Sequence, residues 1–253
     1  MIKVYKLIAA LTLLILLIGC SNEDPLLPIP KVNFRTGTDI LEVGKPVLFE
    51  NLTTNASSYK WDFGDGQTSV EISPTITYDE SGTFTVKLVA FTDDSQSDSV
   101  SREFDVGERV MTDILINSIP FHNPDNENWD DPTGLPDSTK YPDFILILSP
   151  QDDFSMSIWT PPIYDLAPFV LPVGFTLDPS GDPYILTDET WEMTFVDFDG
   201  EDIETAEESD FEIMEVITFN PVDIFTSTVN EDGLGLIQVS IDQYSVDILF
   251  QIE

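Results

Sequence analysis

Carboxylates are the side chains of this sequence most able to do chemistry, and they gather in two segments of its second half. One segment runs from residue 130 to 143 and the other from residue 197 to 210. Each adjoins an apolar, strand-like run, so a strand would deliver its carboxylates into a loop. Loops rich in Asp can supply the roughly six to eight oxygen ligands that Ca²⁺ prefers. Both segments are therefore candidate calcium sites. The alternative is that the acids only keep an exported protein soluble.

The sequence has too few cysteines and histidines for most chemistry that depends on these residues. His122 is the only histidine and Cys20 the only cysteine, which excludes zinc sites and a Cys–His nucleophile pair. The sequence has no G-x-S-x-G elbow, phosphate-cradling loop or dinucleotide fingerprint. A carboxylate pair of the glycosidase kind stays open, because acids are abundant. We predict that the protein is not an enzyme and has no catalytic residue.

The charge balance narrows the range of partners. The chain has 47 Asp and Glu against 10 Lys and Arg, a formal net charge of −37. From Val110 onward, Lys140 is the only base. Nucleic acid and anionic lipid both require a basic face, so neither is a predicted partner. Divalent cations would relieve the repulsion among so many carboxylates.

The N-terminal residues predict export and a lipid anchor. Lys3 and Lys6 precede an apolar run over residues 7–18, which fits a signal-peptide core and is short for a membrane span. The ending, Leu17-Ile18-Gly19-Cys20, resembles the bacterial lipobox, which implies a signal peptide of residues 1–19 and acylation of Cys20. Residues 20–30 would form the anchor and a stiff tether. The stretch Ser21-Asn22-Glu23-Asp24, with two acids directly after the Cys, resembles the surface-export signal of Bacteroidetes lipoproteins, which implies the outer face of the outer membrane.

Residues 31–107 consist of short alternating runs divided by turn residues, the pattern of an antiparallel β-sandwich. Trp61 and Phe63 would face the core, and Gly64 and Gly66 would let the chain reverse tightly. Tyr78, which precedes a turn and a long alternating strand, suits a tyrosine corner.

The hexapeptide from Trp61 to Gly66, followed by Y-x-x-x-G-x-F-x-V-x-L from Tyr78, resembles the polycystic-kidney-disease (PKD) domain. The resemblance implies an immunoglobulin-like β-sandwich that serves as a spacer or binding module and has no active site. Asp62 and Asp65 could be taken for metal ligands, but we expect their side chains to stabilise the turn through hydrogen bonds to the backbone.

Residues 110–253 continue with strand-like runs and show no helical periodicity. The runs are 114–119, 144–148, 154–159, 190–196, 211–219, 236–241 and 245–252. A helical turn is expected around residues 205–209, and the proline-rich stretch 160–183 is expected to be an extended connection rather than a central strand. The predicted fold class is all-β, with two β-sandwich domains in tandem.

The order of acids in residues 110–253 resembles a calcium-binding C-two domain, an eight-stranded sandwich with ligands in its tip loops. In that family one loop has Asp, Gly and an Asp that opens a strand, and a later loop has Asp-x-Asp and a third Asp. The spacing between Asp199 and Asp210 is longer than usual in that family. The resemblance implies the candidate calcium ligands Asp130 (or Asp131), Asp137, Asp143, Asp197, Asp199 and Asp210.

These features predict a non-enzymatic, lipid-anchored surface protein that displays a protein- or glycan-binding module, with calcium as its one candidate cofactor. The alternative is a carbohydrate-binding or carbohydrate-processing accessory lipoprotein of a polysaccharide-utilisation system. Trp129, Trp159 and Tyr164 would stack on sugars if they are exposed, whereas core packing would explain them otherwise.

Overall fold

The computed structural model describes residues 28–127, 129, 141–164, 166–167, 170–178, 183–199, 204–223 and 228–253. These residues are all-β, as predicted, with only short 3-10 turns between strands. None of the described residues belongs to a helix long and apolar enough to cross a membrane. The predicted signal peptide, Cys20 and most of the tether lie outside the described residues, as do Asp130 and Asp137.

The first module, residues 28–107, is built on a five-stranded sheet in the order β2-β9-β8-β5-β6, with β2 parallel to β9. Two small pairs, β1-β4 and β3-β7, complete it. The strands are β1 (Phe34–Arg35), β2 (Ile40–Glu42), β3 (Pro46–Leu48), β4 (Glu50–Asn51), β5 (Ser58–Asp62), β6 (Thr68–Ser69), β7 (Thr75–Thr77), β8 (Gly82–Phe91) and β9 (Ser97–Gly107). Its fully buried core includes Phe34, Phe49, Trp61, Phe63 and Leu88.

The turn after β5 has the structure that its sequence predicts. Trp61 and Phe63 are fully buried, and their rings are stacked with centroids 6.0 Å apart. The Asp62 carboxylate accepts a hydrogen bond from the N–H of Gly64 at 3.1 Å, so it stabilises the turn as expected. Gly64 has φ +84°, and a Cβ there would lie 2.9 Å from the backbone of Thr85, so only glycine fits.

The tyrosine corner is also confirmed. The Tyr78 hydroxyl is buried and donates to the carbonyl of Phe63, upstream in the chain, at 3.1 Å. This bond connects the segment before β8 to the end of β5, and it provides a donor to the carbonyl of the buried residue Phe63.

The second module, residues 109–253, is a sandwich of a five-stranded sheet, β13-β10-β18-β17-β16, and a four-stranded sheet, β12-β11-β14-β15. One apolar cluster joins the inner faces, with Ile114 and Ile248 from the first sheet and Phe144 and Phe195 from the second. The strands are β10 (Arg109–Ser118), β11 (Phe144–Pro150), β12 (Ile158–Trp159), β13 (Val173–Thr176), β14 (Trp191–Phe198), β15 (Phe211–Phe219), β16 (Thr228–Val229), β17 (Leu234–Ile241) and β18 (Tyr244–Ile252).

Three details of this module differ from the sequence-based expectation. The predicted strand 154–159 is a 3-10 turn, Phe154–Met156, followed by β12, because the Asp153 side chain accepts the N–H of Ser155 and caps the turn. The stretch 160–183 contains β13, although its place at a sheet edge agrees with the prolines around it. The described residues form nine strands in this module, one more than a C-two domain has.

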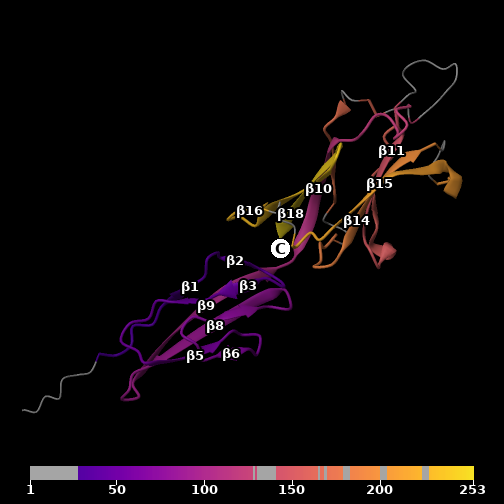
Figure 1. The fold of residues 1–253 in the computed structure, drawn as a ribbon. Helices are drawn as coiled ribbons and strands as arrows, with labels where there is room; N and C mark the ends of the chain where they lie inside the picture. The colour runs from indigo at the N-terminus through magenta and orange to yellow at the C-terminus, as the bar shows by residue number, and fades with distance from the viewer. Residues whose placement is uncertain are drawn as a thin grey trace, which may run out of the picture.

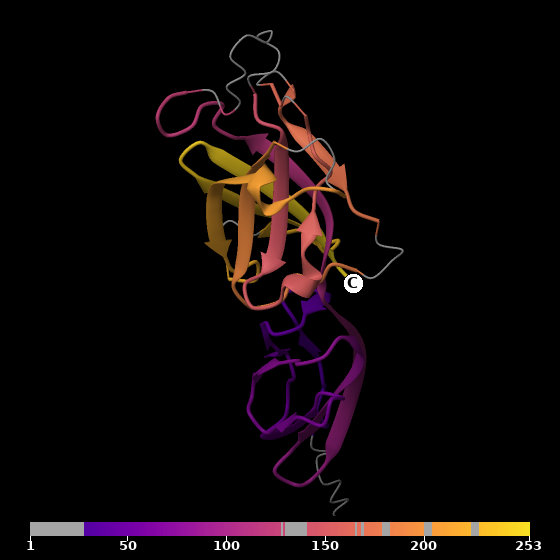
Figure 2. The ribbon, with the colours of Figure 1, turned by 90° about the vertical axis from the view of Figure 1, so that its right-hand side faces the viewer.

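The two modules lie end to end, with the chain passing from β9 directly into β10 (Figures 1 and 2). The last strand, β18, returns to the same place, so the C-terminus lies between the modules (Figures 1 and 2). We call this region the junction and the opposite end of the second module, beyond the end of β10, the distal end.

Candidate functional site

The junction begins with backbone hydrogen bonds that fix the connection between the modules. Glu108 and Glu253 exchange N–H···O bonds of 2.8 and 3.1 Å, which tie the linker to the C-terminal residue. Val43 of the first module donates to the carbonyl of Gly107 at 3.0 Å. A Cβ on Gly107 would lie 2.6 Å from the Glu253 carbonyl oxygen, so glycine is required for this close approach.

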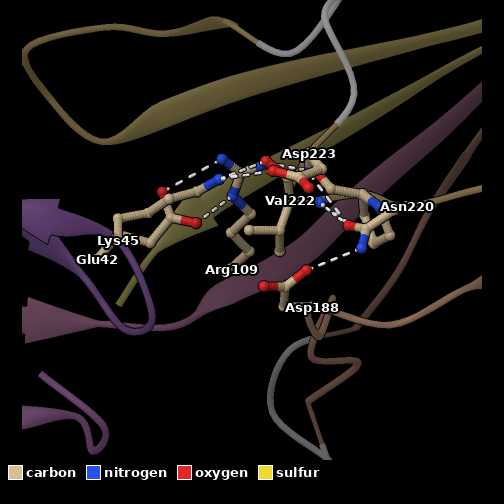
Figure 3. Close-up of polar contacts among 8 residues, drawn as sticks. Glu42, Lys45, Arg109, Asp188, Asn220, Val222 and Asp223 are labelled. Carbon is tan, nitrogen blue, oxygen red and sulfur yellow. Dashed lines mark hydrogen bonds and ion pairs between the residues drawn. The ribbon is translucent and has the colours of Figure 1, made fainter. Parts of the chain in front are cut away.

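Arg109, the first residue of β10, holds the junction through its guanidinium group (Figure 3). Its Nε donates to Glu42 Oε1 at 2.6 Å and its Nη2 to Oε2 at 3.2 Å, so the pair is bidentate. Nη1 donates to the carbonyl of Pro221, and Cζ lies 4.6 Å from the centroid of the Phe250 ring. The Arg109 and Glu42 side chains are only 5% and 11% exposed. The ion pair is therefore shielded from water, where removal of one partner is strongly destabilising.

The loop at residues 220–223 provides backbone carbonyl acceptors for Arg109 and Lys45 at the junction. The Asn220 side chain accepts the N–H groups of Val222 and Asp223 at 2.8 and 3.0 Å, and its own amide donates to Asp188 at 2.8 Å (Figure 3). The turned loop presents the carbonyl of Val222 to Lys45 Nζ at 2.6 Å. The first module therefore contributes Glu42 and Lys45 to one polar network with the second module.

Arg109, Glu42 and Lys45 were not among the residues predicted to form a site. One signal was available, since Arg109 is the last base before a long segment in which Lys140 stands alone. A lone base at the start of an acidic segment has many potential partners, and sequence does not show which carboxylate it meets.

Four of the predicted calcium ligands lie at one end of the four-stranded sheet. Asp197 is fully buried and accepts the N–H of Asp143 at 2.9 Å. The N–H of Asp199 donates to the carbonyl of Asp210 at 2.9 Å, and the Asp210 carboxylate accepts the N–H of Glu207 at 2.8 Å. The chain therefore brings Asp143, Asp197, Asp199 and Asp210 to neighbouring strand ends. One carboxylate oxygen of Asp197 and one of Asp210 already accept backbone N–H groups.

These four carboxylates do not by themselves make a calcium site. Among the described residues, no group of three or more His, Cys, Asp or Glu side chains is arranged to hold a metal ion. Asp130 and Asp137 lie outside that part of the chain. Calcium binding therefore stays a prediction that depends on the segment around residues 130–140.

The distal end carries a cavity of about 410 Å³. Its wall comes from the loop after β10, from β15 and from the turn between β17 and β18. The lining includes three aromatic side chains, Phe121, Trp129 and Tyr244, with Glu215 and His122 among the polar groups. This volume is within the roughly 300–1,000 Å³ that is usual for small-molecule sites, and the lining of the cavity is mainly polar.

The other aromatic residues predicted to bind sugars lie elsewhere. Trp159 is 49% exposed, and its ring meets that of Phe211 edge-on at 6.2 Å. Tyr164 is 52% exposed. Trp129, in contrast, is half-buried at the distal cavity, where its indole N–H donates to the carbonyl of Pro120 at 3.2 Å.

Sequence comparison identifies the first module. Residues 28–106 match the family model of the PKD domain, so this part of the chain is a PKD domain, as predicted. The PKD1 domain of Vibrio anguillarum Epp is 32% identical and covers 31% of this chain and 94% of that chain, with a TM-score of 0.28.

Two curated relatives contain similar segments. The pre-pro-metalloprotease PrtV of Vibrio cholerae serotype O1 is 40% identical over 60 residues, 22% of this chain and 6% of the protease. Collagenase ColA of Bacillus cereus is 28% identical over 110 residues, 44% of this chain and 10% of the collagenase. The chain thus spans only a small part of the length of either relative.

Proposed function

We propose that this protein is a non-enzymatic binding protein of the cell surface. An acyl group on Cys20 would anchor it in the outer membrane, and the PKD domain would be a rigid spacer. The second module would be the head that meets a protein or glycan outside the cell.

The junction is the observation that carries this proposal. Tandem domains joined only by a linker move independently by default. Here a buried bidentate ion pair and a bond from Lys45 to the carbonyl of Val222 join the modules, and two exchanged backbone bonds tie the linker residue Glu108 to Glu253 of the second module. A rigid connection of this kind suits a spacer, because it holds the head at a fixed distance and orientation from the anchor.

Fractionation and labelling of intact cells test the display function. We expect the wild-type chain in the outer-membrane fraction, with the second module accessible to an antibody on unbroken cells. The Cys20→Ser variant should leave the membrane fraction, since a single serine cannot be acylated in the same way. A wild-type chain found only inside the cell would contradict the proposal, and so would a Cys20→Ser variant that stays membrane-bound.

A second candidate function, carbohydrate binding by the head, is favoured by the distal cavity. Aromatic and hydrogen-bonding side chains meet there, at the end of the molecule opposite the junction. The described chain begins at the end of the PKD domain away from the second module (Figure 1), so with an anchor at Cys20 the distal end would point outward from the membrane.

A further inference from the structure

The distal cavity has rings that the fold already holds in place. The Tyr244 ring lies 4.7 Å from the Phe195 ring, and its hydroxyl donates to the Met214 carbonyl at 3.3 Å. Phe121 packs edge-on against Tyr141 at 5.9 Å. Rings fixed in the free protein lose little conformational entropy when a ligand binds, which favours affinity.

The wall on the β15 side depends on a β-bulge. The pairing of β14 with β15 passes from Phe195↔Glu215 to Val196↔Ile213, so Met214 is the extra residue. Bulges re-aim side chains next to binding sites. In this strand both Met214 and Glu215 line the cavity, although neighbours on a regular strand point to opposite faces.

The polar groups at the cavity are acids, amides and one histidine. Glu215 and Asp242 supply carboxylate oxygens, Gln243 supplies an amide, and His122 is the one basic type among the lining residues. Asp242 and Gln243 form the exposed two-residue turn between β17 and β18. With Lys140 as the only Lys or Arg after Arg109, the surrounding module repels anions.

We propose that the distal cavity binds an uncharged saccharide. An uncharged sugar ring has an apolar face that packs on aromatic rings and hydroxyl groups that donate to carboxylates and amides. The half-buried Phe121 and Trp129 would contact the apolar face, and the buried Tyr244 ring would support them from the core side. Glu215 and Asp242 would accept the hydroxyl hydrogen bonds. Uronic and sulfated sugars would be rejected by the same carboxylates. This proposal rests on the head being the binding module, and it names the ligand class and the site.

The test is binding of the purified full-length chain to an array of neutral glucose, mannose, galactose and xylose oligomers and their uronic-acid counterparts. We expect binding to neutral oligomers only. Calorimetry then gives the Kd of each oligomer that binds. Trp129→Ala should weaken the best neutral hit at least about tenfold, the loss expected for about 1.4 kcal/mol of contact. Trp159→Ala removes an exposed Trp away from the cavity, so its Kd should stay within about twofold of wild type.

A second variant guards against loss of folding in Trp129→Ala. Asp242→Asn changes one exposed turn residue, and Asn tolerates the positive φ of 49° found there. It should also weaken binding while circular dichroism and the melting curve stay unchanged. Binding lost in Trp159→Ala but kept in Trp129→Ala would overturn the site. An array with no hits, or with acidic sugars only, would overturn the ligand class. Neither result bears on the anchor, which the cell-labelling experiment tests separately.

Discussion

The two ends of the second module use their polar groups in opposite ways. At the junction, Arg109 is buried and spends its donors on Glu42 and Pro221, and the loop at Asn220 is folded around those contacts. At the distal end, His122, Asp242 and Gln243 are exposed around an open cavity. The polar groups of the junction are paired within the protein, whereas those named at the distal end are exposed.

This difference indicates a division of labour within one sandwich. Buried charges that are paired fix one arrangement of neighbouring elements, while exposed polar groups beside aromatic rings are typical of recognition surfaces. At one end, a buried ion pair ties the acidic second module to the PKD domain. At the other end lies its best candidate binding site.

Loss of the Arg109 guanidinium should have the largest effect. Arg109→Met leaves Glu42 as a buried carboxylate without its cation, which costs about 3–5 kcal/mol and roughly 6–20 °C in melting temperature. Arg35→Met is the matched control, because the ion pair of Arg35 with Glu50 is exposed on both sides and should contribute less than about 1 kcal/mol. Thermal unfolding of both variants and of the wild type gives the change in melting temperature. Equal losses of melting temperature in the two variants would contradict the claim that the buried ion pair stabilises the protein more than the exposed one.

Alkaline pH should act on the distal end through Tyr244. Burial, and then the charge of Glu215, raise the pKa of Tyr244 from 10.0 to about 12. The folded protein therefore keeps this proton while the unfolded chain loses it, so stability is complete below pH 10 and falls as pH rises through 12. Burial also raises the pKa of Tyr78, so part of the loss belongs to the PKD domain.

Tyr244→Phe separates these two contributions. The variant should be less stable at neutral pH by about 1 kcal/mol, because the bond to Met214 is lost. It should also lose less stability than wild type between pH 10 and 12. Melting curves recorded across this range give the slopes. A variant with the wild-type slope would mean that the Tyr244 hydroxyl is not shielded at the distal cavity.

Calcium should have the smallest effect, since no three of the described carboxylates are arranged to hold a metal ion. We expect weak binding, with a Kd of about 10⁻⁴–10⁻³ M, and a rise of a few degrees in melting temperature at about 10 mM calcium. Asp137→Asn should remove that rise. Calorimetry in chelated buffer would contradict calcium binding if it gave no heat up to millimolar calcium and the melting temperature stayed constant.

The fold could be predicted from sequence where local chemistry decides it. The turn at Gly64, the buried Trp61 and the Tyr78 bond to Phe63 all follow from residue types at short spacing. The short strands β2, β6 and β7 were not predicted from the sequence, because two or three residues are too few to reveal an alternating pattern. The 3-10 turn at Phe154 was missed because its apolar pattern is also that of a strand.

The candidate site was less predictable, because long-range contacts determine it. The pairing of Arg109 with Glu42 and of Lys45 with Val222 joins residues far apart in the sequence. Trp129 was noted as a sugar-stacking residue, yet nothing in the sequence places it across a cavity from Tyr244. Abundant acids also conceal which carboxylates meet.

Distance measurement between spin labels tests the rigid junction most directly. Lys60→Cys and Ser240→Cys place labels on exposed strand positions of the two modules, with Cys20→Ser removing the native thiol. We predict one narrow distance peak, as narrow as that of the pair Lys60→Cys and Ser99→Cys within the PKD domain, and a broader one once Arg109→Met is added. A broad or divided distribution in the chain that keeps Arg109 would contradict the rigid spacer.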